Sequence, residues 1–295
     1  MAITSPALSM SIEALFAAVK PATDTLQKLG AIDFTDEAPG IDIKPGATIN
    51  VPIASVTAAS EYNTSSNHYG TGGATSFASL TAKHYLQGFD ISGVDIDKGL
   101  NLARMRNIFA KRAGLGVSLA AMGAVKTALD ACTACTSTTD GIKMPAASDI
   151  TVADYLGLGS SITWLDKSTA ALAVNGATLA DIKSKLAATH VVAASDAELA
   201  GFLGVGSVVL IPGMTARACI VPAGAFGSLA RVPKVIVDYE ESGVETDEES
   251  GLSIGIVVNG DRNLNRRIVN ADLWFGVATA TSNAAAAQSG IVKYS

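Results

Sequence analysis

Residues 97–135 read DKGLNLARMRNIFAKRAGLGVSLAAMGAVKTALDACTAC, and no other helix-like segment of the chain approaches this length. The stretch contains no proline, the residue that most strongly breaks a helix. At a rise of 1.5 Å per residue, a helix of this length would extend about 50 Å, which exceeds the thickness of most globular domains. Apolar or small side chains recur every three or four positions and should share one face: Leu102, Met105, Phe109, Ala113, Val117, Ala120, Ala124, Ala128 and Ala131. The stretch therefore predicts a long helical spine.

The second half of this spine is built from alanine and is interrupted by Gly114, Gly116 and Gly123. Glycine inside a helix costs about 1 kcal/mol relative to alanine, so its presence indicates that neighbouring backbone comes close. We expect a broad sheet against this half of the helix, with Ala120 and Ala124 facing the core.

Composition limits the class of protein. The chain has 295 residues, of which 48% are hydrophobic, 16% charged and 5% aromatic. So few charges suit a protein that buries much of its surface in subunit contacts. The net charge of −6 does not resemble that of a nucleic-acid-binding protein.

Cysteine usage and hydropathy indicate the cellular compartment of the protein. Three cysteines, Cys132, Cys135 and Cys219, give an odd number, which disfavours a secreted disulfide framework and favours a reducing compartment. No basic residue precedes the apolar residues at the amino terminus, so we expect no signal peptide. The longest uncharged run of the spine, 113–125, is shorter than the roughly 20 residues of a membrane span, so we expect no membrane contact.

Before the spine, the pattern of residues 9–29 predicts a short docking helix that Pro21 breaks or kinks. Residues 47–56 and 77–91 are strand-like and enclose a segment rich in Ser, Thr, Asn and Gly. The sequence therefore predicts a long hairpin with a polar tip of about 17 residues, well above the usual two to five, and such long connections are usually functional.

After the spine, short strands and a helix at 178–188 predict a compact unit over roughly 140–230. Its expected strands are 171–174, 191–193, 208–211 and 218–221. The remainder predicts a β-meander with strands at 232–239, 252–258 and 266–279 and a tight turn at Asn259-Gly260. The predicted fold class is α+β.

Catalytic and metal-binding motifs are weak. Cys132 and Cys135 have the spacing of half a zinc site, but no second pair exists and they stand at the carboxyl end of the helix, where the dipole does not favour a thiolate. His68, His84 and His190 lack ligand spacing. We predict no catalytic residue, metal or cofactor, and keep an α+β enzyme or binding domain with an unrecognised site as an alternative.

Seven carboxylates lie between Asp238 and Glu249, in a spacing that does not match a calcium loop. We interpret them as a solvated hairpin loop that meets a basic patch on a neighbouring molecule. The candidate bases are Arg104, Arg106, Lys111, Arg112, Arg262, Arg266 and Arg267. The alternative is that these bases form ordinary solvated faces.

The order of these parts resembles the major capsid protein of tailed bacteriophages, whose fold is shared with encapsulin shells. Three segments besides the spine carry the resemblance: residues 45–53, PGATINVPI, which enter the extended hairpin; residues 83–94, its return; and residues 265–278, the closing strands. The resemblance covers essentially the whole chain and rests on the order of elements.

The resemblance implies an amino-terminal arm (1–33), an extended loop (34–95), a peripheral domain with the spine helix (96–135 and 231–295) and an axial domain (136–230). It implies no enzyme activity, but a structural protein of the virion that assembles with itself, as hexamers and pentamers, into an icosahedral shell around double-stranded DNA in the host cytoplasm. Further partners would be a separate scaffolding protein, a portal, decoration proteins and, without sequence specificity, the packaged DNA. An encapsulin-like nanocompartment shell is the alternative within this fold.

The extended loop has too few apolar residues to bury itself, so we expect it to lie across a neighbouring subunit. The candidate subunit-interface residues are Glu61, Tyr62, Asn63, His68, Tyr69, Gly72, Arg104, Arg106, Lys111, Arg112, Glu240, Glu241, Arg266 and Arg267.

Overall fold

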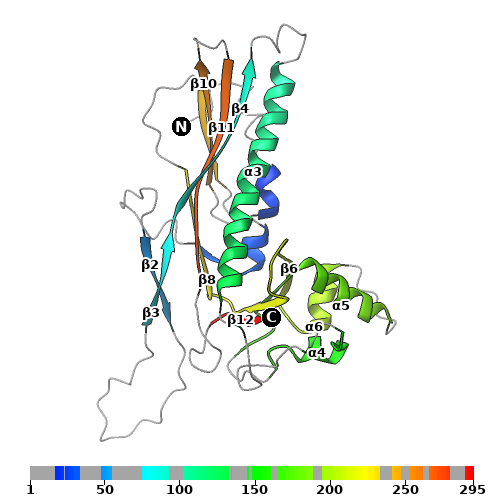
Figure 1. Cartoon of the computed structure of the whole chain (residues 1–295). Helices are drawn as coiled ribbons and strands as arrows, with labels where there is room; N and C mark the ends of the chain where they lie inside the picture. The colour runs from blue at the N-terminus through cyan, green and yellow to red at the C-terminus, as the bar shows by residue number, and fades with distance from the viewer. Residues whose placement is uncertain are drawn as a thin grey trace, which may run out of the picture.

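The computed structural model of the chain combines one long helix with a long twisted sheet, a hairpin and a smaller α+β unit (Figure 1). Helix α3 lies along the sheet, the smaller unit lies at the lower right of the view, and the hairpin at the lower left. The structure describes residues 17–22, 24–33, 48–54, 75–92, 102–132, 134, 145, 148–160, 165–188, 195–232, 241–246, 253–261, 266–279 and 290–295.

Helix α3, Leu102–Ala131, confirms the predicted spine, with 30 residues and a length of about 45 Å. Its buried side consists of residues at most 2% exposed: Ala110, Ala113, Val117, Ala121, Val125 and Leu129. The buried side differs from the predicted stripe in the second half. Ala121 and Val125 are buried there, whereas Ala120 and Ala124 are half-buried and Ala131 is exposed.

The larger sheet has six strands in the order β1-β8-β11-β10-β9, with β4 on the other edge of β11. The strands are β1 Ile32–Asp33, β4 Lys83–Ser92, β8 Phe226–Arg231, β9 Glu241–Thr246, β10 Ser253–Asp261 and β11 Arg266–Thr279. Strands β9, β10 and β11 pair antiparallel in sequence, so the predicted meander is confirmed. Long β11 organises the sheet, because it pairs with β4 along one edge and with β10 and then β8 along the other.

Two details of the meander differ from the sequence prediction. Asn259 and Gly260 do not form a turn, since they pair with Ile268 and Arg267 inside the β10–β11 ladder. The ladder continues to Asp261 and Arg266, so the strands connect through residues 262–265. Part of the acidic stretch, predicted as loop, is strand β9. The predicted strand 232–239 falls almost wholly outside the described residues.

One face of the large sheet forms a common core with α3, since alternate residues of a strand point to the same side. Leu273 and Phe275 of β11 and Ile254 and Ile256 of β10 are at most 1% exposed and cluster with the buried side of the helix. Residues 17–22 and 24–28 are helical, and Val19, Leu26 and Leu29 join the same core. Pro21 therefore does not end the helical region.

The smaller unit has a four-stranded sheet in the order β12-β7-β5-β6. Its elements are α4 Val152–Gly157, β5 Ala171–Val174, α5 Gly176–Ala188, α6 Asp196–Leu203, β6 Ser207–Leu210, β7 Ala218–Val221 and β12 Val292–Tyr294. Capping boxes begin two of the helices, Thr151 with Asp154 at α4 and Ser195 with Glu198 at α6. The strands predicted at 171–174, 208–211 and 218–221 and the helix at 178–188 are confirmed, while 191–193 lies outside the described residues.

By the expected domain boundaries, β8 would belong to the axial domain and β12 to the peripheral domain. In the structure β8 pairs in the larger sheet and β12 in the smaller sheet. Strand β8 pairs with β11 in the large sheet, because a turn at Pro222–Ala225 reverses the chain after β7. Strand β12 pairs with β7 in the small sheet, where Tyr294 is 1% exposed. The carboxyl terminus thus ends inside the smaller unit.

A polar cluster joins the end of α3 to the smaller unit. The Asp130 carboxylate accepts hydrogen bonds from the amides of Thr215 (3.0 Å) and Ala216 (3.1 Å) and pairs with the Lys126 ammonium (3.3 Å). Lys293 of β12 donates to the Asp130 carbonyl. Burial alone would raise the pKa of Asp130, but these hydrogen bonds outweigh it and hold the pKa below its usual value.

By length and composition alone, the segment Ile108–Ala131 could cross a membrane, a test that the core helices of soluble proteins also pass. In this chain one side of the segment forms the core with the large sheet. We therefore interpret the apolar residues of its buried side as packing residues.

Candidate subunit-interaction surfaces

The hairpin consists of β2, Thr48–Ala54, and β3, Thr75–Thr81, paired antiparallel from Thr48 with Thr81 to Ala54 with Thr75. It extends beyond the edge of the large sheet (Figure 1). Its base enters the body, where Leu80 is fully buried and Gly276 of β11 leaves room for it: a Cβ on Gly276 would lie 2.8 Å from Leu80 Cδ2. A lone two-stranded ribbon is marginally stable in water, so the hairpin requires further contacts. The predicted hairpin is confirmed over 48–54 and 75–81, whereas residues 83–92 of its predicted return form β4 and pair with β11 of the large sheet. The connection, 55–74, lies outside the described residues.

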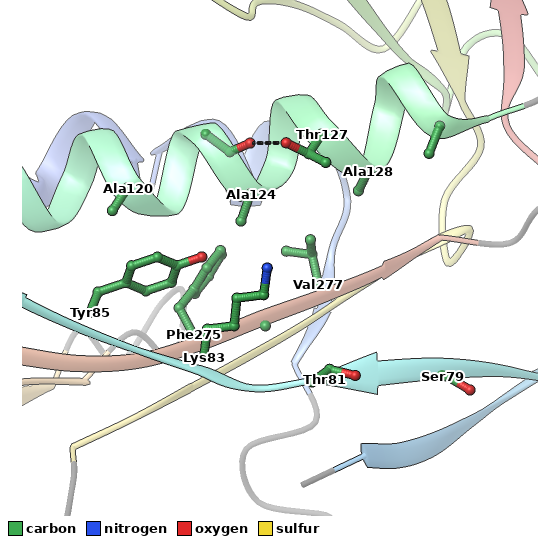
Figure 2. Close-up of a pocket in the computed structure, with 13 residues that line it drawn as sticks. Ser79, Thr81, Lys83, Tyr85, Ala120, Ala124, Thr127, Ala128, Phe275 and Val277 are labelled. Carbon is green, nitrogen blue, oxygen red and sulfur yellow. Dashed lines mark hydrogen bonds between the residues drawn. The ribbon is translucent and has the colours of Figure 1, made fainter. Parts of the chain in front are cut away.

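A cavity of about 380 Å³ opens between α3 and the sheet, next to the base of the hairpin (Figure 2). Its walls come from β3, β4, α3 and β11: Ser79, Thr81, Lys83, Tyr85, Ala120, Gly123, Ala124, Thr127, Ala128, Ala131, Phe275, Gly276 and Val277. The helical wall consists only of small side chains. A cavity of this volume can hold one or two amino-acid side chains.

Two polar side chains of β4, Lys83 and Tyr85, project from the sheet toward the helix (Figure 2). They are two residues apart in one strand and therefore share a side. Neither the Lys83 ammonium nor the Tyr85 hydroxyl has a hydrogen-bond or ion-pair partner within the described residues. Burial raises the pKa of Tyr85, so its hydroxyl stays a donor at neutral pH. The cavity thus presents a cation and a hydroxyl donor.

The helical side of the cavity is open. A Cβ on Gly123 would meet nothing within 4 Å, so the prediction of close backbone at this glycine is wrong. At Gly116 the prediction of a close neighbour is right, since a Cβ there would lie 3.0 Å from Gln87 Cγ of β4. The Thr127 hydroxyl is occupied locally and donates to the Gly123 carbonyl at 2.8 Å.

The outward side of α3 carries the candidate bases Lys111 and Arg112, and both are exposed. Neither has an ion-pair partner in the part of the chain that the structure describes. The same side carries Ile108, Leu115 and Leu119, which are 45%, 44% and 72% exposed. This surface combines positive charge with exposed apolar side chains.

The remaining interface candidates within the described residues lie on α3, β9 and β11. Arg266 pairs with Asp90 of the neighbouring strand β4, so a local carboxylate supplies its partner. Arg104 and Arg106 belong to the first turns of α3, Glu241 to β9 and Arg267 to β11. The other candidates lie outside the described residues: Glu61, Tyr62, Asn63, His68, Tyr69, Gly72 and Glu240.

The residues considered for metal or redox chemistry lie in surroundings that fit a structural role. No group of three or more His, Cys, Asp or Glu side chains that could hold a metal ion occurs within the described residues. Cys132 and Cys219 are buried, and burial raises the pKa of both thiols. The His84 ring lies 2.9 Å from the buried Asp272 carboxylate. Cys135, His68 and His190 lie outside the described residues.

Comparison with solved structures identifies capsid and particle proteins. The capsid of Ralstonia phage GP4 matches with a TM-score of 0.52 and 11% identity, over 90% of this chain and 86% of that chain. A virus-like particle from Pyrococcus furiosus matches with a TM-score of 0.49 and 11% identity, over 96% of each chain. A structure from Mycobacterium phage Che8 matches with a TM-score of 0.47 and 15% identity, over 88% and 87%. No protein-family model and no curated protein sequence matches.

The chain is an α+β protein with the tailed-phage capsid-type fold. The match to the GP4 capsid, which spans most of both chains, carries this statement about the fold. The predicted fold class is therefore confirmed.

Sequence reasoning missed the cavity. Its two signals were present: Lys83 and Tyr85 alternate along a strand, and Ala120, Ala124 and Ala128 recur every four residues along the helix. Neither signal states that the two walls face each other, because that depends on how β11 brings β4 alongside α3.

Proposed function

We propose that this chain is the major capsid protein of a tailed bacteriophage and that its copies assemble into an icosahedral shell around the double-stranded DNA genome. One observation carries the proposal: a hairpin that extends beyond a body of one long helix on one long sheet (Figure 1). The fold match to the capsid of phage GP4 supports it.

The physical argument concerns the hairpin. Strand β2 reads TINVPIA and strand β3 reads TSFASLT, so each contains apolar residues, and the pair forms a sheet of two strands only. Isolated two-stranded ribbons are marginal in water. A closed lattice of identical subunits supplies the missing contacts, because every hairpin can lie on the next subunit around a ring.

The same proposal assigns the parts of the chain. Residues 1–33 form the arm, 34–95 the extended loop, 96–135 with 231–295 the peripheral domain, and 136–230 the axial domain. We assign β8, which pairs in the six-stranded sheet, to the peripheral domain and β12, which pairs in the four-stranded sheet, to the axial domain.

Contacts between subunits involve the candidate interface residues. Lys111 and Arg112, both exposed, are suited to meet Glu240 and Glu241 of a neighbouring copy, since opposite charges fix register across an interface. Assembly as hexamers and pentamers, a scaffolding protein, a portal, decoration proteins, non-specific DNA contact and assembly in the host cytoplasm belong to this proposal.

Negative-stain electron microscopy of the purified protein tests the proposal. Round particles tens of nanometres across are expected. A discrete species near the 29.9 kDa subunit mass, or a small oligomer, would instead support an α+β enzyme or binding domain. Nucleic acid inside the particles supports a phage capsid, whereas packaged protein supports an encapsulin-like shell.

A second experiment tests the role of the loop. Replacing residues 61–73 with a short turn should leave a folded subunit that no longer assembles. Full-size particles at normal yield would refute this role for the loop.

A further inference from the structure

We propose that the cavity between α3 and β4 receives Glu61 and Tyr62 from the extended loop of a second copy, with the Glu61 carboxylate on the Lys83 ammonium and the Tyr62 ring against the alanine wall. This inference rests on the proposed shell function and names the receiving site for the loop.

The polar side chains of the cavity suit a carboxylate. Lys83 and Tyr85 project into it and have no partner within the described residues (Figure 2). A lysine ammonium, which only donates hydrogen bonds, lies beside a half-buried tyrosine hydroxyl that can also donate one, a combination that suits a carboxylate. The Tyr85 hydroxyl remains protonated, since burial raises the pKa of this side chain.

The charges of the loop and the cavity are complementary. Segment 55–74, which connects β2 to β3, contains one charged residue, Glu61. Lys83 is the only charged residue among those that line the cavity. The single negative charge of segment 55–74 therefore matches the single positive charge among the residues that line the cavity.

The walls of the cavity suit an aromatic side chain. The wall of Ala120, Gly123, Ala124 and Ala128 is smooth, and Phe275 and Val277 form an apolar floor. Aromatic side chains bury about 150–250 Å² each and gain most from such a surface. Tyr62 follows Glu61 directly, so one short segment brings both groups.

The position of the loop favours a second copy over the same chain. The loop leaves the hairpin at Ala54 and returns at Thr75, at the end of the ribbon that is remote from the cavity. From Thr75 to Lys83 the strands run about 26 Å at 3.3 Å per residue. A loop that filled its own cavity would have to run back along its own hairpin, whereas the hairpin already carries the loop toward a neighbour.

Charge reversal tests the pairing. Lys83→Glu and Glu61→Lys should each lower the yield of particles by at least about tenfold, and the double variant should restore it, because truncating or reversing one partner of a desolvated pair is costly. Lys28→Glu, at an exposed lysine outside the cavity, is the matched control and should leave the yield unchanged. If Lys83→Glu lowers the unfolding temperature of dissociated subunits, Lys83→Gln is compared instead.

Disulfide cross-linking identifies the partner. Chains carrying only Tyr62→Cys are co-assembled with chains carrying only Ala124→Cys, and the particles are oxidised and run on a non-reducing gel. A dimer band that appears in mixed particles and in neither single variant is expected. Absence of that band, or a bridge inside single chains carrying both substitutions, would overturn the inference.

Different outcomes would refute the proposed shell function and the proposed role of the cavity. If the wild-type chain forms no particles, the shell function is wrong. If the wild-type chain and Lys83→Glu form particles equally well, the shell function stands and the cavity does not receive the loop.

Discussion

Two sides of helix α3 face the sheet, and both consist of small residues. One side packs against the strands, whereas the other borders a cavity. On one side, Ala113, Val117 and Ala121 are at most 2% exposed and pack against the strands. On the other, Ala120, Gly123 and Ala124 face a cavity of about 380 Å³. Small side chains thus do two things on one helix: they allow close packing where backbone approaches, and they leave a space where it does not.

We expect the buried side of α3 to serve folding and the cavity side to serve assembly. Protein interiors are packed as tightly as organic crystals, so the buried side of α3 tolerates little change in volume. On the cavity side Ala124 and Ala128 pack only partly against the core, and Gly123 borders open space, so this side leaves room for contacts between subunits. Substitutions on the two sides should therefore change different measurements.

The largest effect is expected for truncation on the buried side. Leu129 is fully buried, and Leu129→Ala should lower the free energy of unfolding by about 2–5 kcal/mol, through lost burial and the void left behind. Leu119→Ala, on the 72% exposed outward side of the same helix, should change it by less than about 0.5 kcal/mol. Urea unfolding of dissociated subunits measures both. Equal losses would mean that the assignment of the two sides is wrong.

The next effect concerns the end of α3, where the outward side is occupied by the smaller unit. Asp130→Ala leaves the amides of Thr215 and Ala216 without their acceptor and should cost about 1.5–3 kcal/mol at pH 7. Because the pKa of Asp130 is lower in the folded state, the carboxylate contributes this stability above about pH 4, the ordinary aspartate value, and the contribution is lost as the pH falls through the folded pKa.

Urea unfolding of the wild type and Asp130→Ala at pH 7 and at pH 3 measures this contribution. The gap between the two proteins should narrow at the lower pH. Asp196→Ala is the control, since its ion pair with Lys183 is exposed and should contribute about 1 kcal/mol or less. A gap that is constant with pH would exclude the carboxylate as its cause.

A third effect compares neighbouring alanines. Ala121 is 2% exposed, and Ala121→Leu should destabilise the subunit by about 1–3 kcal/mol through overpacking. Ala124→Leu extends into the cavity and should change unfolding by less than about 0.5 kcal/mol, while it lowers the yield of particles. A variant Ala124→Leu that assembles normally would show that the cavity stays empty in the particle.

Ala121 and Ala124 also show which features of the fold can be predicted from the sequence. The spine was predictable because a 30-residue helix without proline repeats its apolar pattern many times. Which alanines are buried was not, since Ala120, Ala121, Ala124 and Val125 all fit an apolar stripe and only the position of the sheet selects among them. Similarly, Asn259-Gly260 has the composition of a tight turn, but the β10–β11 register places it inside a ladder.

The candidate site was harder to predict from the sequence than the fold. Charged interface residues were chosen by composition, and Arg266 has a partner on β4 that lies 176 positions away in the sequence. The cavity depends on two segments that β11 brings together, β4 with Lys83 and Tyr85 and the wall of α3. Long-range pairing of this kind leaves no local signal.

The smallest effect compares two glycines of α3. Gly123→Ala places a methyl group in open space and should raise the stability of the subunit by about 0.5–1 kcal/mol, the helix preference for alanine. Gly116→Ala should gain less, because its methyl group would lie 3.0 Å from Gln87 Cγ and the side chain must move. Thermal unfolding of the dissociated subunits measures the difference. If both variants gain equally, Gln87 yields freely and this glycine does not mark a close approach of β4 to the helix; if Gly123→Ala loses stability, the space beside it is already filled within the subunit.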